Sequence, residues 1–184
     1  VDNLLISEEL VQMHLSQIVG WVKLDGYDGV NIAYMGIDPS LRDDFSRFID
    51  RLADKLHAEG KRLSVQVDPP VQVAEDQWDT DAYDWRRLGA AVDTFRVPAL
   101  ADPATYAAGG QMESLLRWAT RQVERSKIQI QVSTYSHVVA GGEAQERPYA
   151  SVLAEIAQPA LSAPQASVQA GAPLSLDLPK LLKP

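Results

Sequence analysis

Four short apolar segments recur along this chain at a nearly constant interval, which restricts the fold more than any other feature of the sequence. Their central residues, separated by 33, 32 and 33 positions, are Val30, Leu63, Phe95 and Ile128. Stretches with apolar residues at helical spacing lie between them. Repeated strand-helix units with right-handed crossovers give a parallel sheet, either closed into a (β/α)8 barrel or open and doubly wound. The interval alone favours neither arrangement.

The ends of the predicted elements follow from local signals. A first helix begins after the N-cap Ser7 and ends at Gly26, because glycine adopts the left-handed conformation that closes a helix. A second helix follows Asp38-Pro39 and ends at Gly60. Strands are predicted at residues 29–34, 62–67, 94–99 and 128–133, further helices at 84–91, 111–125 and from Pro148, and a long polar connection at 71–83.

Composition indicates a folded domain and excludes several classes of function. The chain has 184 residues, of which 46% are hydrophobic, enough for a core. Its net charge of −8 argues against nucleic-acid binding, and the absence of cysteine excludes disulfides and thiolate chemistry. No apolar run reaches the roughly 20 residues of a membrane span, and residues 1–3 do not resemble a signal peptide. We therefore expect no membrane span and a chain that begins downstream of the native start.

Neither a cofactor nor a metal ion is predicted. The glycine pairs at 109–110 and 141–142 lack the flanking pattern of a phosphate-binding or dinucleotide-binding loop. The acidic residues Glu75, Asp76, Asp79 and Asp81 depart from the spacing of a calcium-binding loop, which favours a solvated acidic loop.

A specific resemblance begins at the first predicted strand, where the sequence reads Asp28-Gly29-Val30-Asn31-Ile32-Ala33-Tyr34-Met35. This segment resembles the fourth-strand signature of glycoside hydrolase family 18, the chitinase-like barrels, whose pattern is Asp-Gly-x-Asp-x-Asp-x-Glu. Asp28 and Gly29 match the pattern. Asn31 and Ala33 replace the second and third Asp, and Met35 replaces the catalytic Glu.

Weaker similarity extends over roughly residues 8 to 157. The segment 52–65 is similar to the fourth helix and fifth strand of the family, and segments 83–93 and 118–135 are similar to later elements. The family pattern Met-x-Tyr-Asp at the sixth strand is replaced at Pro98, Leu100 and Ala101, and only Tyr135 remains of the seventh-strand motif. The resemblance implies an α/β, partial TIM-barrel-like domain at residues 1–157. Residues 158–184, rich in Pro and Ala with one strand-like run at 174–178, are predicted to be an extended tail or linker.

The replaced motif positions imply loss of the family's chemistry. In that family a Glu protonates the glycosidic oxygen while the substrate's acetamido group attacks, steadied by the neighbouring Asp. A thioether at Met35 donates no proton, and a methyl group at Ala33 cannot orient the acetamido group. We therefore assign no catalytic residue and expect a pseudoenzyme.

Three classes of function follow: a catalytically silent module that binds glycan or forms a structural surface, an active glycosidase that uses Asp28 or Asp68 instead, and an assembly component. The first and third are favoured. Candidate carbohydrate-binding residues, chosen as polar groups near strand ends or as aromatic rings, are Asn31, Asp68, Trp78 and Tyr135. Trp85 also suits a helix anchor, and core packing is expected for Trp21 and Trp118. By resemblance the protein is expected to be extracellular or at the cell surface.

The strands of this chain account for only part of a barrel. We expect a protein partner, or the remainder of a longer chain, to complete it, because an isolated half barrel would expose strand edges and an apolar inner face. Side chains alternate along a strand, so Asn31, Ala33 and Met35 are predicted to point into the barrel. Val30, Ile32 and Tyr34 should then face the helices.

Overall fold

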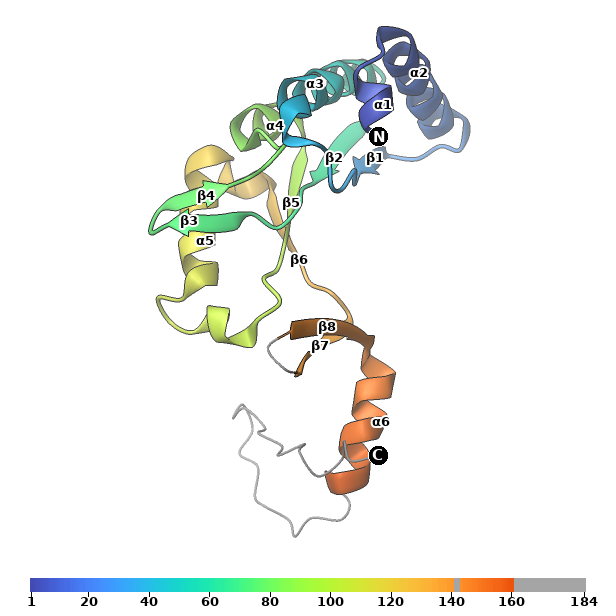
Figure 1. The fold of residues 1–184 in the computed structure, drawn as a ribbon. Coiled ribbons are helices and arrows are strands. Elements are labelled where there is room, and N and C mark those ends of the chain that lie inside the picture. The colour runs from blue at the N-terminus through green and yellow to red at the C-terminus, as the bar shows by residue number, and fades with distance from the viewer. Residues whose placement is uncertain (141–142, 161–184) are drawn as a thin grey trace. The chain divides into compact units, whose positions relative to one another are not determined.

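The computed structural model describes residues 1–140 and 143–160 (Figure 1). The chain divides into two compact units, one formed by Val1–Val132 and the other starting at Ser133, and each is described by itself. The predicted tail at 158–184 lies almost entirely outside the described residues, so the predicted domain boundary stays a prediction.

A four-stranded parallel sheet forms the centre of the first unit. Its strands, in spatial order, are β1 (Gly29–Ile32), β2 (Arg62–Gln66), β5 (Thr94–Pro98) and β6 (Ile128–Gln131). All three neighbouring pairs are parallel. Val30 lies opposite Leu63, and Phe95 lies opposite Ile128. The predicted set of four consecutive, adjacent strands is confirmed.

Two helices precede β1, and the others lie between the strands in the way the repeat predicted. The helices are α1 (Asp2–Leu5), α2 (Glu8–Leu24), α3 (Arg42–Ala58), α4 (Trp85–Ala91) and α5 (Gln111–Gln122), with short 3-10 turns at Pro39–Leu41, Pro103–Tyr106 and Arg125–Lys127. The side chain of Ser7 accepts a hydrogen bond from the Leu10 amide and caps α2. Gly26, which follows α2, has a φ of 69°, as the predicted left-handed helix end requires.

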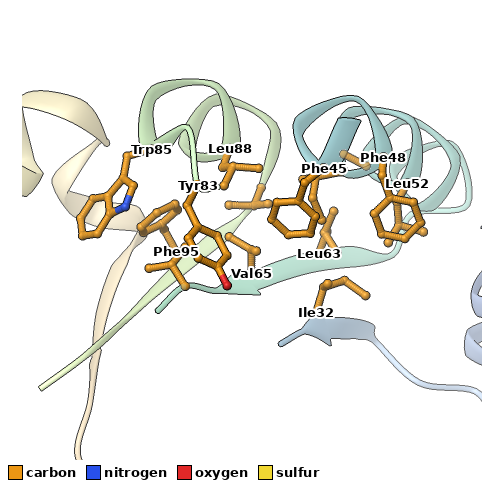
Figure 2. Packing of buried hydrophobic residues seen from close by; sticks show 14 of the residues in the cluster. Ile32, Phe45, Phe48, Leu52, Leu63, Val65, Tyr83, Trp85, Leu88 and Phe95 are labelled. Atoms are coloured by element: carbon orange, nitrogen blue, oxygen red, sulfur yellow. The ribbon is translucent and has the colours of Figure 1, made fainter. Parts of the chain in front are cut away.

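The hydrophobic core lies between the sheet and these helices. Figure 2 shows Leu63, Val65 and Phe95 of the strands beneath residues of α3 and α4, among them Phe45, Phe48 and Leu88. Each of these six side chains is at most 1% exposed. Truncating a buried aromatic ring in such a core typically costs about 3–5 kcal/mol. This layer therefore holds the strands, and the residues that follow them, in fixed positions.

The opposite face of the sheet carries polar side chains. Asn31 lies beside Ser64, and Gln66, Arg96 and Gln129 follow one another across β2, β5 and β6. The expectation of an exposed apolar inner face was therefore wrong. Its cause is the alternation of each strand, because residues such as Phe95 and Val97 turn to the helices while Arg96 between them turns away.

The predicted polar connection at 71–83 contains structure that the sequence reading missed. β3 (Val71–Ala74) and β4 (Gln77–Asp79) form an antiparallel hairpin with an irregular register. The hairpin lies beside α5 in Figure 1, and an ion pair of 3.3 Å joins Asp76 to Arg121 of α5. Val71 and Val73 alternate with Gln72, but the alternating run is only three residues long, and both valines are exposed in the structure.

The second unit contains a hairpin and a helix. β7 (Tyr135–Ala140) pairs antiparallel with β8 (Glu143–Pro148), and α6 (Tyr149–Ala160) follows. The helix predicted from Pro148 is confirmed, whereas the hairpin was not predicted. None of the described helices is long and apolar enough to cross a membrane.

Candidate functional site

Two of the motif positions, Ala33 and Met35, follow the carboxyl end of β1 (Gly29–Ile32). Ile32 is buried, and the half-buried Tyr34 packs on Phe48 and on His14, whose ring nitrogen hydrogen-bonds to the Tyr34 hydroxyl. Ala33 and Met35 alternate with them and are exposed, Met35 to 43%. The predicted alternation of the motif is therefore present in the structure.

Asp68, two residues beyond β2, fixes the loop that carries Met35. Its Oδ2 accepts hydrogen bonds from the Gly36 amide at 2.8 Å and from the Tyr83 hydroxyl at 2.9 Å. The Tyr83 hydroxyl also lies 2.7 Å from the main-chain oxygen of Tyr34. Burial, followed by the hydrogen bond to Asp68, raises the pKa of Tyr83 well above its usual value, so the phenol stays a neutral donor.

Asn31 and Asp28 lie further from that end of the strand. The Ser64 hydroxyl donates to Oδ1 of Asn31 at 2.8 Å, which orients the amide. Both Asn31 and Asp28 line a cavity of about 260 Å³ on the polar face of the sheet. Gly29, between them, is required for close strand pairing, because a Cβ there would lie 2.1 Å from the main-chain oxygen of Arg62.

One of the proposed aromatic contacts, Trp78, is not arranged as expected. Trp78 is only 7% exposed, and its ring packs 6.5 Å from that of Trp118, so it presents no open face for stacking on a sugar. The interpretation of Trp85 as a helix anchor is confirmed, since its ring packs 4.9 Å from Phe95. Tyr135 is 54% exposed and belongs to the second unit, so its place near the other candidates stays a prediction.

The expectation of core packing for Trp21 was wrong, and the polar residue Arg96 was not identified. Trp21 is 59% exposed because it lies beside, and not within, the buried stripe of α2 that includes Leu15 and Ile18. His14 supports Tyr34, a role that depends on a contact between distant segments and leaves no local signal. Arg96 faces the open side of the sheet, which the polar-apolar alternation of β5 could have indicated.

Chemically, this arrangement can bind but lacks the family's proton donor. The exposed group at the end of β1 is a thioether, and the neighbouring carboxylate of Asp68 uses Oδ2 for two hydrogen bonds within the protein. Within residues 1–140 and 143–160, no cluster of three or more His, Asp or Glu side chains could hold a metal ion.

Comparison with known proteins relates this geometry to chitinases. The chain superposes on the class V chitinase from Pseudomonas fluorescens with a TM-score of 0.67 and 25% identity, over 84% of this chain and 50% of that one. For the chitinase from Chromobacterium violaceum the TM-score is 0.69 and the identity 26%, over 83% of this chain and 50% of the other. The chain is a partial chitinase-like barrel, resembling glycoside hydrolase family 18.

Sequence comparison agrees with this assignment. The partial barrel is 22% identical over 129 residues to the uncharacterized glycosylase YvbX of Bacillus subtilis, covering 66% of this chain and 37% of YvbX. No family model matches the sequence. The partial barrel thus spans about half of the solved chitinases and little more than a third of YvbX, and its four parallel strands correspond to part of a TIM barrel.

Proposed function

We propose that this chain is a glycan-binding module of the chitinase-like kind that does not hydrolyse its ligand. One observation carries the proposal: Met35 is exposed at the carboxyl end of β1, where the resemblance implies a proton-donating Glu. A glycosidic oxygen needs a proton as the bond breaks, and a thioether has none to give. The relatives are named as glycosylases or chitinases, which supports a carbohydrate as the ligand.

The residues proposed for binding are Asn31 and Asp68. Asp68 keeps Oδ1 available to accept a sugar hydroxyl while Oδ2 holds the Gly36 amide and the Tyr83 hydroxyl. This anchoring makes Asp68 a rigid acceptor, because both of its donors are positioned by β1 and by the buried Tyr83 ring. Hydrolysis through Asp28 is disfavoured by position, since Asp28 immediately precedes β1, at the opposite end of the strand from Met35.

A second candidate function, an assembly component whose barrel a further polypeptide completes, is supported by a different observation. Beyond its buried stripe, α2 carries a second set of apolar side chains that are 38% to 84% exposed: Leu10, Met13, Trp21 and Leu24. Exposed apolar groups aligned on one helix face commonly mark a protein interface. The free edges of β1 and β6 would accept further strands on the same partner. A position outside the cell or at its surface fits either function and is proposed with them.

The test is a pair of measurements on the full chain with N-acetylglucosamine oligomers. Calorimetric titration should show binding, and chromatography of the same mixture should show no product above a heat-denatured control. Asp68→Asn should weaken binding, because the remaining acceptor loses its charge. Asp54→Asn, an exposed change on α3, should leave binding unaltered.

Two results would contradict the proposal. Absence of binding would favour the assembly role. Product release that Asp28→Asn or Asp68→Asn abolishes would show that a displaced carboxylate performs hydrolysis.

A further inference from the structure

The polar cavity lined by Asp28 and Asn31 lies toward the end of the sheet opposite to Met35 and Asp68. The cavity of about 260 Å³ opens near the amino ends of three strands, because Gly29, Arg62 and Thr94 are the first residues of β1, β2 and β5. Its polar lining consists of Asp28, Asn31, Arg62, Ser64, Thr94 and Arg96. The cavity shares Asn31 with the glycan site proposed above, but neither Met35 nor Asp68 lines it.

Arg96 is the residue in this cavity whose bonding is least satisfied. Its neighbours Phe95 and Val97 are fully buried on the helix side, so the Arg96 side chain lies on the open face of the sheet. Among the described residues, the Nε atom is inaccessible to solvent and has no hydrogen-bond partner. In the described part of the chain no carboxylate pairs with this guanidinium, which carries five N–H donors. A desolvated, unpaired donor group of this kind calls for an acceptor.

Other unused donors line the same cavity. The Ser64 hydroxyl holds Oδ1 of Asn31, which leaves the amide nitrogen of Asn31 free to donate. Among residues 1–140 and 143–160, neither the Thr94 hydroxyl nor the Arg62 guanidinium forms a hydrogen bond. Asp28 is the single carboxylate of the lining. The lining holds two guanidinium groups and one carboxylate, and Asp93 outside the lining also interacts with the charge of Arg62. Arg96 is therefore the cation that leaves the cavity locally positive.

We propose that this cavity binds a small hydroxylated carboxylic acid, the chemistry of a sugar acid. A carboxylate matches the planar fork of Arg96 with two parallel hydrogen bonds, and Arg62 adds a second positive charge. The amide of Asn31 and the hydroxyl of Thr94 donate to oxygens of the ligand, while Asp28 accepts from one of its hydroxyl groups. The inference shares Asn31 with the proposed glycan site but rests on Arg96 and Arg62, which that site does not use.

The test uses the full chain, labelled with ¹⁵N, and D-glucuronate as the probe. Glucuronate should produce saturable NMR shifts at residues 28–31, 62–64 and 94–96, and D-glucose at the same concentrations should not. Added salt should weaken binding, since part of the affinity is electrostatic. Arg96→Gln should lower the affinity at least about tenfold. Arg96→Lys keeps the positive charge but loses the planar pair of donors. Its affinity for glucuronate should lie between those of the unmodified chain and of Arg96→Gln.

Controls separate binding from folding. Arg96 has no partner within the described residues, so Arg96→Gln should retain the circular dichroism spectrum of the unmodified chain. Arg47→Gln removes a guanidinium that pairs with Asp44 on the exposed side of α3, and it should not change the affinity. Equal binding of glucose, unchanged binding by Arg96→Gln, or no saturable shift would overturn the proposal. The last result would leave a carboxylate from a further polypeptide strand as the partner for Arg96, and it would not affect binding of N-acetylglucosamine oligomers near Asp68.

Discussion

The Tyr83 hydroxyl lies 2.9 Å from Oδ2 of Asp68 and connects the segment before α4 to the loop after β2, 15 positions earlier in the sequence. Asp68 follows β2, and the same carboxylate oxygen holds the Gly36 amide in the loop after β1. The ring of Tyr83 is 1% exposed and meets Phe45 edge-on at 5.6 Å. The hydrophobic core therefore sets the position of the candidate site through one phenol group.

Replacement of Tyr83 by Phe should destabilise the chain while keeping the ring in the core. The change leaves Oδ2 of Asp68 with one donor and the Tyr34 carbonyl without its side-chain partner, which should cost about 1–3 kcal/mol. Urea unfolding measures the difference. The matched control is Tyr106→Phe, because its hydroxyl also donates to a carbonyl, that of Leu100, but on an exposed ring. An equal loss of unfolding free energy in both variants would show that burial of the hydrogen bonds of Tyr83 adds no stability.

Replacement of Gly29 by any larger residue should destabilise the chain, although the backbone conformation of Gly29 is ordinary. In Gly29→Ala the new methyl would meet the main-chain oxygen of Arg62 at 2.1 Å, so β1 and β2 must move apart. We expect a loss of about 1–3 kcal/mol in the free energy of unfolding. Gly20→Ala in α2 has nothing within 4 Å and should instead stabilise by up to about 1 kcal/mol. Thermal unfolding of both variants should show a lower melting temperature for Gly29→Ala and a higher one for Gly20→Ala. A higher melting temperature for Gly29→Ala would contradict the close approach of position 29 to the main chain of Arg62.

Asp93 should make stability depend on pH in the acid range. Partial burial acts to raise its pKa, but hydrogen bonds from the Leu63 amide and from His57 hold the pKa below the ordinary value of 3.8. A lowered pKa in the folded state gives a stabilisation that is present above the unfolded pKa and lost as the pH falls through the folded one. The difference in urea midpoint between the unmodified chain and Asp93→Asn should therefore be largest near neutral pH and shrink below about pH 4.

The size of that effect should be small, because the carboxylate is 38% exposed and solvent screens it. Asp54→Asn, on the exposed side of α3, provides the control and should show no such trend. A constant difference across the acid range would mean that the Asp93 contacts are not charge-dependent.

Restoring the two missing acidic residues should recover little hydrolysis. In Met35→Glu with Ala33→Asp, the new carboxylates would stand at the end of β1, where the resemblance places catalytic groups. General acid catalysis is worth about 10²- to 10⁴-fold, so success would be obvious in a chromatographic assay of N-acetylglucosamine oligomers. We expect only background release, since Leu100 and Ala101 still replace polar residues of the family motif after β5. Full chitinase-like turnover by the double variant would show that these positions alone silence the chain.

The strands and the resemblance were predictable from the sequence because both depend on local pattern. The even spacing of Val30, Leu63, Phe95 and Ile128 determined the four parallel strands, and Ser7 and Gly26 determined the ends of α2. The replacement of the family's catalytic Glu by Met35 was also predictable, since a motif compares residue types at fixed positions. These features require no knowledge of contacts between distant residues.

Tertiary structure decided which side chains are available for binding. Trp78 looked suitable for a sugar, but packing against Trp118 buries it, while Trp21 looked like a core residue and remains exposed. The bonds of Asp68 to Gly36 and Tyr83 join three segments. Within the part of the chain that the structure describes, Nε of Arg96 has no partner because the neighbouring strands place none beside it. Periodicity specifies which face of an element is apolar. It does not specify which partner covers that face, because burial and hydrogen bonding arise between residues that only folding brings together.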